Sequence, residues 1–290
     1  MIFSGHFFSK ILRKLRYWKF IYSSPIAPIK PLKSKETQTL LVTIAFNEAA
    51  LIETQIELLR KYFKDPFEHI IVDNSTDFEK REMIRQICLK NQVGYMGVPQ
   101  NPYTQNKSHA AGMHWAYFQL VKKSNCSRFG FLDHDIFPIS DFSLRGKMEI
   151  GLYGRVMHAY FKNGYLERYN PEIPYWSLWA GYCFFDRKMF QAPFPWSMNF
   201  FSKHFKDGFF LDTGGGLWDS LYSKITYPGT IASYRVENVL KNDSSEIQNQ
   251  SFEILDESWV HFVSLSNWRK ITDLDMKKSI LLKMLNSALN

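Results

Sequence analysis

Short apolar runs alternate with helical patterns through the first half of this 290-residue chain, and this alternation constrains its fold most strongly. Each apolar run is short and continuous, as in a strand that is covered on both faces. The stretches between them repeat apolar residues every three or four positions, which is typical of helices. The predicted strands are Leu40–Phe46, His69–Val72, Val93–Val98 and Phe129–Leu132, and the predicted helices are 48–63, 78–91 and 106–122. This order predicts an α/β domain with a mainly parallel sheet flanked by helices.

The cations are concentrated at the N-terminus. The chain has 36 Lys and Arg against 28 Asp and Glu, a net charge of +8. Residues 1–35 hold eight of the cations and no acid, so the remaining 28 cations balance the 28 acids. A nucleic-acid-binding domain carries its cations on the folded surface. The distribution therefore argues against a nucleic-acid partner and predicts a basic extension on a neutral body.

Residues 1–38 are expected to form this extension, an amphipathic helix followed by a linker. One helical face would carry Phe7, Ile11, Leu15, Trp18 and Tyr22. A basic helix with aromatic anchors can lie on an anionic membrane surface, and the alternative is that it packs on the body or on another subunit. The prolines that follow indicate an extended linker: Pro25, Pro28 and Pro31.

The sequence shows no apolar run that fits a signal peptide or a transmembrane helix. Its three cysteines have no metal-type or redox-type spacing, so we expect no disulfide framework and a reducing compartment. Together with the basic extension, these features predict a cytoplasmic protein held peripherally at the inner face of a membrane.

Polar residues follow three of the predicted strands, where the sheet of an α/β domain binds its ligands. Asn47-Glu48 follows the first, with Asn47 also a suitable cap for the next helix. Asp73 ends the second, and Asp133-His134-Asp135 ends the fourth. Alternation along an extended chain directs both aspartates to one side and His134 to the other. Two such carboxylates suit Mg²⁺ or Mn²⁺, and the alternative is a solvated turn.

The series LLVTIAFNE, IIVDNSTD, an Asn-led helix and FGFLDHD resembles the nucleotide-sugar half of a GT-A glycosyltransferase of the family-two-like group. The resemblance covers residues 39–262, with 39–150 as the nucleotide-sugar half and 151–262 as the acceptor half. Residues 263–290 are expected to form a C-terminal helix from their apolar pattern. The resemblance implies a GT-A-like, Rossmann-like fold. It also implies metal-dependent transfer of a sugar from a nucleoside-diphosphate donor, a UDP-sugar above all. The acceptor would be a glycan or lipid-linked glycan in cell-surface polysaccharide synthesis.

The resemblance also implies a donor site. Phe46, Asn47 and Glu48 would lie near the base and ribose, and Asp73 would contact uracil or its equivalent. The usual Pro-Thr-Tyr-Asn-Glu is replaced here by Ile44-Ala45-Phe46-Asn47-Glu48, which keeps the aromatic residue and the Asn-Glu pair, and Ser75 stands where Asp or Gly is common. The helix that begins near Asn106 would offer its N-terminus, with His109, to the donor phosphates or sugar.

For the metal, the resemblance implies that Asp133 contacts the ribose or the metal shell and that Asp135 is a direct ligand of Mn²⁺ or Mg²⁺. His261, in Trp259-Val260-His261-Phe262, would supply a third ligand, and the alternative is a core histidine.

For the acceptor half, Trp179-Ala180-Gly181 resembles the glycine-containing aromatic segment that meets acceptor and donor sugar. The resemblance also implies an acid on a loop as the general base of an inverting transfer, for which Asp212 is the candidate and Asp219 the alternative.

Two other function classes remain open. A haloacid-dehalogenase-like phosphatase would use Asp133 as its nucleophile, but Ile136-Phe137 does not continue that motif. A non-catalytic, metal-dependent sugar-binding protein would not explain the nucleoside-type first half. The products of incubation with a nucleotide sugar would separate the three classes.

Overall fold

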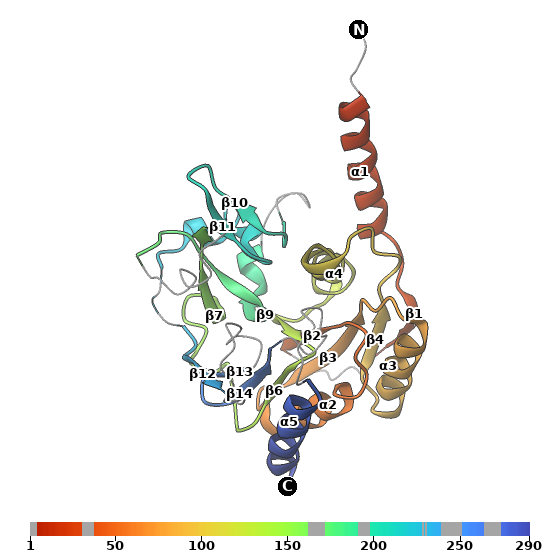
Figure 1. Ribbon diagram of the computed structural model, residues 1–290, viewed down its shortest axis with the longest axis vertical. Coiled ribbons are helices and arrows are strands. Elements are labelled where there is room, and N and C mark those ends of the chain that lie inside the picture. Colours follow the sequence, from red (N-terminus) through yellow and green to blue (C-terminus); the bar gives the residue numbers. More distant parts are fainter. Residues whose placement is uncertain are drawn as a thin grey trace.

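The structure is a computed structural model. It describes residues 5–30, 38–161, 172–190, 198–227, 229, 231–238, 251–263 and 274–290, with the backbone alone at 5–10, 237, 238 and 251. Figure 1 shows a central sheet between helices, with α1 (Gly5–Ile21) projecting at one end of the molecule and α5 (Leu274–Leu289) lying at the other. The predicted α/β fold class is confirmed.

The central sheet has seven strands in the order β1-β4-β3-β2-β5-β9-β7. Its middle strands β4, β3, β2 and β5 run parallel, and β1, β9 and β7 join antiparallel. The bounds are β1 Ile26–Ile29, β2 Thr39–Ala45, β3 Phe67–Asp73, β4 Gly94–Gly97, β5 Arg128–Asp133, β7 Leu152–His158 and β9 Trp176–Asp186. Every residue of β2 is buried, as the continuous apolar run predicts for a central strand.

Helices cover both faces of the parallel centre. On one face, α4 (Gln105–Gln119) packs on Val42 and Val72. On the other, α2 (Ile52–Tyr62) and α3 (Phe78–Lys90) pack on Ala45 and Ile71. The alternation of side chains along each strand produces these two cores.

A second sheet begins where the first one ends. It has four strands in the order β12-β13-β14-β6, and α5 packs between it and α2. Its bounds are β6 Ile136–Pro138, β12 Tyr234–Asn238, β13 Ser251–Leu255 and β14 Trp259–Phe262. A small third sheet holds β8 (Tyr160–Phe161), β10 (Lys203–His204) and β11 (Phe209–Leu211). Asp133 and Asp135 therefore lie at the crossing from the first sheet into the second.

The N-terminal segment is more closely tied to the body than a tail and linker would be. The predicted helix is present as α1, and its last residues Phe20 and Ile21 are buried against α4. Gln119 Nε2 donates to the carbonyl oxygen of Ile21 at 2.9 Å. Ile26–Ile29, expected in the linker, is an edge strand that pairs with β4, while Pro31 lies outside the described residues. None of the described helices combines the length and hydropathy needed to span a bilayer.

The structure corrects one local prediction, the helix cap at Asn47, and shows where the C-terminal helix lies. Asn47 does not cap a helix, because α2 begins five residues later and its N-cap is Leu51. The C-terminal helix is present from Leu274, with Leu281 and Leu285 buried, and residues 264–273 lie outside the described residues. The three cysteines are buried free thiols in the structure.

Candidate active site

Three elements bring predicted site residues together around Asp133. Asp133 ends β5, His109 lies in the first turns of α4, and Asp212 follows β11. His109 Nε2 lies 3.1 Å from Asp133 Oδ1, and Asn106 Nδ2 lies 3.5 Å from Asp212 Oδ1. Asp212 Oδ1 also accepts from the backbone N–H of Thr213 at 2.8 Å. The N-terminus of α4 and the end of β5 thus face each other.

Asp135 forms a second pair with His261. The Asp135 carboxylate is buried in the turn before β6, and its Oδ1 lies 3.6 Å from Nε2 of His261 on β14. This buried oxygen has no hydrogen-bond partner among the described residues. Within the same residues, no group of three or more His, Cys, Asp or Glu side chains is arranged to hold a metal ion by itself. His134 faces away and lies 3.3 Å from the carbonyl oxygen of Ile44, as alternation predicts.

The electrostatics of the two aspartates differ because their neighbours differ. Burial raises the pKa of Asp133, but His109 beside it, together with His261 and His134, holds that pKa below its ordinary value. Burial, with some help from the Asp133 charge, raises the pKa of Asp135 despite His261 nearby. Burial lowers the pKa of His109, but Asp133, Asp135 and Asp212 raise it overall. The aspartates therefore give the site a negative charge, which His109 and His261 partly neutralise.

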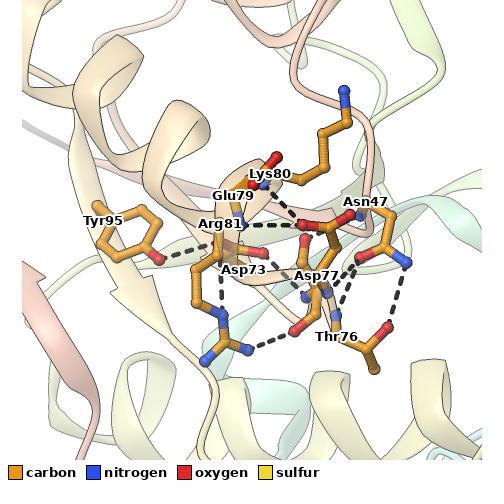
Figure 2. A network of polar contacts seen from close by, with 9 residues as sticks. Asn47, Asp73, Thr76, Asp77, Glu79, Lys80, Arg81 and Tyr95 are labelled. Atoms are coloured by element: carbon orange, nitrogen blue, oxygen red, sulfur yellow. Dashed lines mark hydrogen bonds and ion pairs between the residues drawn. The ribbon is translucent and has the colours of Figure 1, made fainter.

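Hydrogen bonds join the loop after β2 to the loop after β3 (Figure 2). Asn47 adopts a left-handed backbone, φ 51°, which Asn tolerates, and its side-chain oxygen accepts from the N–H groups of Thr76 and Asp77. The Asp73 carboxylate is fully buried and accepts from Tyr95 Oη and from the N–H of Ser75, each at 2.9 Å. Both residues shape the strand-end loops, and a direct contact with a nucleoside stays a prediction.

The other two predicted donor residues lie beside this loop. Phe46 is partly buried between β2 and Asn47. Glu48 Oε2 lies 3.1 Å from Nζ of Lys278 on α5, and its Oε1 accepts from the N–H of Ala50 at 3.1 Å. Glu48 is therefore engaged with the C-terminal helix, and its role at the base or ribose stays a prediction.

The aromatic segment of β9 reaches the aspartates. Trp179 stacks obliquely on His261, with ring centroids 4.4 Å apart. A Cβ added at Gly181 would lie 2.3 Å from Asp133 Oδ2, so only glycine leaves room for that carboxylate. Asp219, the alternative base, has a side chain that is 71% exposed and paired with Lys203. The assignment of the base to Asp212 stays a prediction.

Four residues around the site were not identified from the sequence: Glu253, Arg155, Gln55 and Lys277. Glu253 accepts from His261 Nδ1 at 2.6 Å and is also paired with Arg155. Burial alone would raise the pKa of Glu253, but Arg155 and His261 lower it to about 2. Gln55 Nε2 donates to the carbonyl oxygens of Asp133 and Ile136 at 2.9 and 2.7 Å.

The fourth missed residue is Lys277 of α5. Burial lowers its pKa to about 8, although Asp135 and Glu253 act against that shift. These four residues contact the site through sheet register and helix packing, which leave no local motif in the sequence.

Comparison with known proteins finds similar solved structures. No protein-family model and no curated protein matches the chain. The mannosyltransferase Ktr4p from S. cerevisiae is 10% identical with a TM-score of 0.37, covering 65% of this chain and 68% of that one. A mannosyltransferase from Pyrobaculum calidifontis, in complex with GDP-mannose and Mn²⁺, is 12% identical with a TM-score of 0.35, covering 64% and 54%.

Glucosyl-3-phosphoglycerate synthase from Mycobacterium tuberculosis, in complex with Mn²⁺, UDP and glucosyl-3-phosphoglycerate, is 17% identical with a TM-score of 0.33. That match covers 53% of this chain and 58% of the synthase. The chain thus spans between half and about two thirds of the length of these proteins.

Proposed function

We propose that the chain is a metal-dependent glycosyltransferase that moves a sugar from a nucleoside-diphosphate donor to a glycan or glycolipid acceptor. The observation that carries the proposal is the pair of carboxylates where β5 ends, with the partly buried Asp133 beside His109 and the buried Asp135 beside His261. Sugar transfer breaks the bond between the anomeric carbon and the diphosphate, so negative charge develops on the departing phosphate. A cation-binding pair of carboxylates at a strand end suits that reaction.

The chemistry of Asp135 supports a divalent cation at this position. Its buried Oδ1 lacks a hydrogen-bond partner among the described residues, and such an oxygen is costly unless something binds it. Since no three such side chains among the described residues are arranged to hold an ion by themselves, Asp133, Asp135 and His261 would hold Mn²⁺ or Mg²⁺ only together with the donor. Because these ions commonly take one or two carboxylates and complete their shell with substrate phosphates, the donor diphosphate would supply the remaining ligands. When bound, the ion would act as a Lewis acid for the leaving diphosphate.

On the acceptor side, we assign the general base to Asp212 in an inverting transfer. Its carboxylate lies near the α4 N-terminus, within 3.5 Å of Asn106, and its charge acts on His109. A base at this point would take the proton of the acceptor hydroxyl as that oxygen attacks the anomeric carbon. Trp179 offers an aromatic face beside His261 against which a sugar ring can pack.

Nucleotide binding and turnover test the proposal. We expect calorimetry to detect UDP, GDP or dTDP binding that needs Mn²⁺ and is lost in Asp135→Ala. With the matching sugar nucleotide and a glycan acceptor, the chain should release nucleoside diphosphate. Release of inorganic phosphate would instead indicate a phosphatase with Asp133 as nucleophile, and binding without turnover would indicate a sugar-binding protein. No binding of any of the three diphosphates would refute the donor half.

We further propose that α1 holds the enzyme at the inner face of an anionic membrane, where a lipid-linked acceptor for cell-surface polysaccharide synthesis would lie. Leu15 is 60% exposed and Leu12 is 40% exposed. The cations of the same helix surround them: Arg13, Lys14, Arg16 and Lys19. Each cation near an anionic surface contributes about 1 kcal/mol of binding.

Charge reversal of α1 tests this placement without disturbing Phe20 and Ile21. The triple variant Arg13→Glu, Lys14→Glu, Arg16→Glu should lose binding to vesicles that contain phosphatidylserine and keep its diphosphate affinity. A matched variant reverses three exposed lysines elsewhere, Lys206, Lys224 and Lys283, and should bind the vesicles like wild type. Equal vesicle binding by both variants would exclude α1 as the membrane contact.

A further inference from the structure

Four buried polar side chains form a line that ends at Asp135. Arg155 Nη1 donates to Glu253 Oε2, and the same oxygen accepts from His261 Nδ1 at 2.6 Å. His261 Nε2 then lies 3.6 Å from Asp135 Oδ1. Arg155, Glu253 and His261 expose only 4%, 9% and 7% of their surface. Burying this many charged groups is costly unless each one is paired. The pairing along this line offsets that cost.

Strand register places His261 between Glu253 and Asp135. Glu253 and His261 are directly opposite each other in the antiparallel pair β13–β14, and on the other side His261 is paired with Ile136 of β6. The N–H of Phe262 donates to the carbonyl oxygen of Asp135 at 2.8 Å. Directly opposed side chains in antiparallel strands are close neighbours. The imidazole therefore has one nitrogen on the carboxylate of β13 and the other toward the Asp135 turn.

A break in strand pairing directs Arg155 to the other end of this line. Gly154 pairs with Cys183 and Val156 pairs with Leu178, so Arg155 alone opposes residues 179–182. Bulges of this kind re-aim side chains beside active sites. A Cβ at Gly154 would lie 2.4 Å from the carbonyl oxygen of Tyr182, so the close approach requires glycine.

The guanidinium of Arg155 lies beside two aromatic rings, Tyr234 of β12 and Trp179 of β9. Its central carbon lies 4.1 Å from the centroid of Tyr234 and 5.5 Å from that of Trp179. Such cation–π contacts fix the plane of the guanidinium. Arg155 is thus a rigid partner that keeps the Glu253 carboxylate in place.

We propose that Glu253, held by Arg155, is a positioning residue that keeps the proton of neutral His261 on Nδ1 and so presents the Nε2 lone pair to a cation at Asp135. An ionised carboxylate only accepts hydrogen bonds, so Nδ1 must be the donor in this contact. Which imidazole nitrogen can bind a metal is set by the hydrogen bond of the other. The inference rests on the proposed function, since it assigns His261 Nε2 as a ligand of the same site.

A merely structural ion pair would make a different prediction. In that case, removal of Glu253 and Arg155 together would change stability but leave the tautomer of His261 and the affinity for Mn²⁺ unchanged. The double variant Arg155→Met, Glu253→Leu serves the test, because replacing a buried ion pair by apolar residues of similar size is usually tolerated. Glu253→Gln is the conservative variant, since its amide oxygen can still accept from Nδ1.

The control variant changes a carboxylate in the same hairpin that does not contact His261. Asp256, in the turn between β13 and β14, accepts from Tyr153 Oη and lies 2.7 Å from Lys147 Nζ. Asp256→Asn therefore perturbs the hairpin to a comparable degree. It also keeps a residue type that tolerates the φ of 56° at this position.

Two measurements decide the inference. The first is NMR of ¹⁵N-labelled histidine rings in metal-free protein at alkaline pH, where the ring is neutral. The second is calorimetric titration of Mn²⁺ in the presence of UDP or GDP. We expect wild type to carry the proton on Nδ1 and the double variant to carry it on Nε2. The double variant should lose Mn²⁺ affinity about 10- to 100-fold. Glu253→Gln should keep the Nδ1 proton, and Asp256→Asn should match wild type.

The outcomes separate the inference from the proposed function. A wild-type ring protonated on Nε2, or a double variant with wild-type Mn²⁺ affinity, would overturn the positioning role while the transferase proposal stands. A wild-type chain that binds no Mn²⁺ with either nucleotide would overturn the proposed function and the inference together.

Discussion

Replacement of Gly181 by alanine adds one methyl group at the most crowded point of the candidate site. Its Cβ would lie 2.3 Å from Asp133 Oδ2 and 2.4 Å from Trp179 Cζ2. Because real Cβ contacts are not shorter than about 3.0 Å, the carboxylate must move by at least 0.7 Å, the difference between 3.0 and 2.3. Both obstructing atoms are side-chain ends. The backbone can therefore keep its place while Asp133 and Trp179 are displaced.

The displacement of Asp133 should lower activity, because the reaction depends on the position of the reacting groups. A misplacement of about 1 Å at a reacting centre costs on the order of 100-fold in rate. We therefore expect Gly181→Ala to lower the release of nucleoside diphosphate about 100-fold and to weaken Mn²⁺-dependent diphosphate binding. Its free energy of unfolding, measured by urea denaturation, should remain close to that of wild type.

Gly112→Ala is the matched control on α4. Its Cβ would meet Asn74 Cγ at 3.5 Å, an ordinary contact distance, so nothing at the site has to move. Alanine also favours the helix over glycine by about 1 kcal/mol. Full activity is expected in this variant. A Gly181→Ala enzyme with wild-type turnover would refute the argument, since it would mean that Asp133 need not stand where the structure has it.

Three further predictions concern the surroundings of the site. Gln55→Leu removes both hydrogen bonds to the turn after β5, so urea denaturation should show a loss of about 2 kcal/mol, and unchanged stability would contradict that role. Burial, and secondly Arg60, lower the pKa of His69 from 6.5 to about 3, so only the unfolded state gains a proton between those values. Stability should then fall with falling pH by about 1.4 kcal/mol per pH unit in that window, and His69→Gln should remove this slope. Asp212→Asn should abolish transfer at near-normal donor affinity, and an active variant would remove Asp212 as base.

The parallel centre of the fold could be predicted because its signals are local. The run from Leu40 to Ala45 is apolar but for Thr43, and every residue of it is buried. The antiparallel additions could not be predicted in the same way. Cys183 pairs with Phe131 across 51 intervening residues, and Ile26 pairs with Gly97 across 70. Nothing local in the sequence specifies such partners, and the neighbouring prolines favoured a linker instead.

The residues of the candidate site also fall into two groups, those that local sequence signals predict and those that only the tertiary structure reveals. Asp133 and Asp135 could be proposed because acids at strand ends mark sites in this kind of sheet, and Asp212 because of the resemblance to a known family. Their supporting residues could not, since Glu253 reaches His261 only through the register of a hairpin and Arg155 reaches Glu253 only through a bulge. For Asn47 the residue type was informative but its assigned partner was wrong. Its side chain binds the loop after β3 in place of a helix end.

Several elements contact the segment from Asp133 to Asp135 because it lies between two sheets. Asp133 ends a strand of the seven-stranded sheet, and Ile136, next to Asp135, begins a strand of the four-stranded sheet. Gln55 of α2 bonds to the backbone on both sides of this step. One carboxylate thus ends the first sheet and the other lies in the turn that leads into the second, and they can act on one ligand only while this turn is held in place. The contacts of α2, β9 and β14 supply that restraint, so a rigid crossing between sheets is the physical requirement of this site.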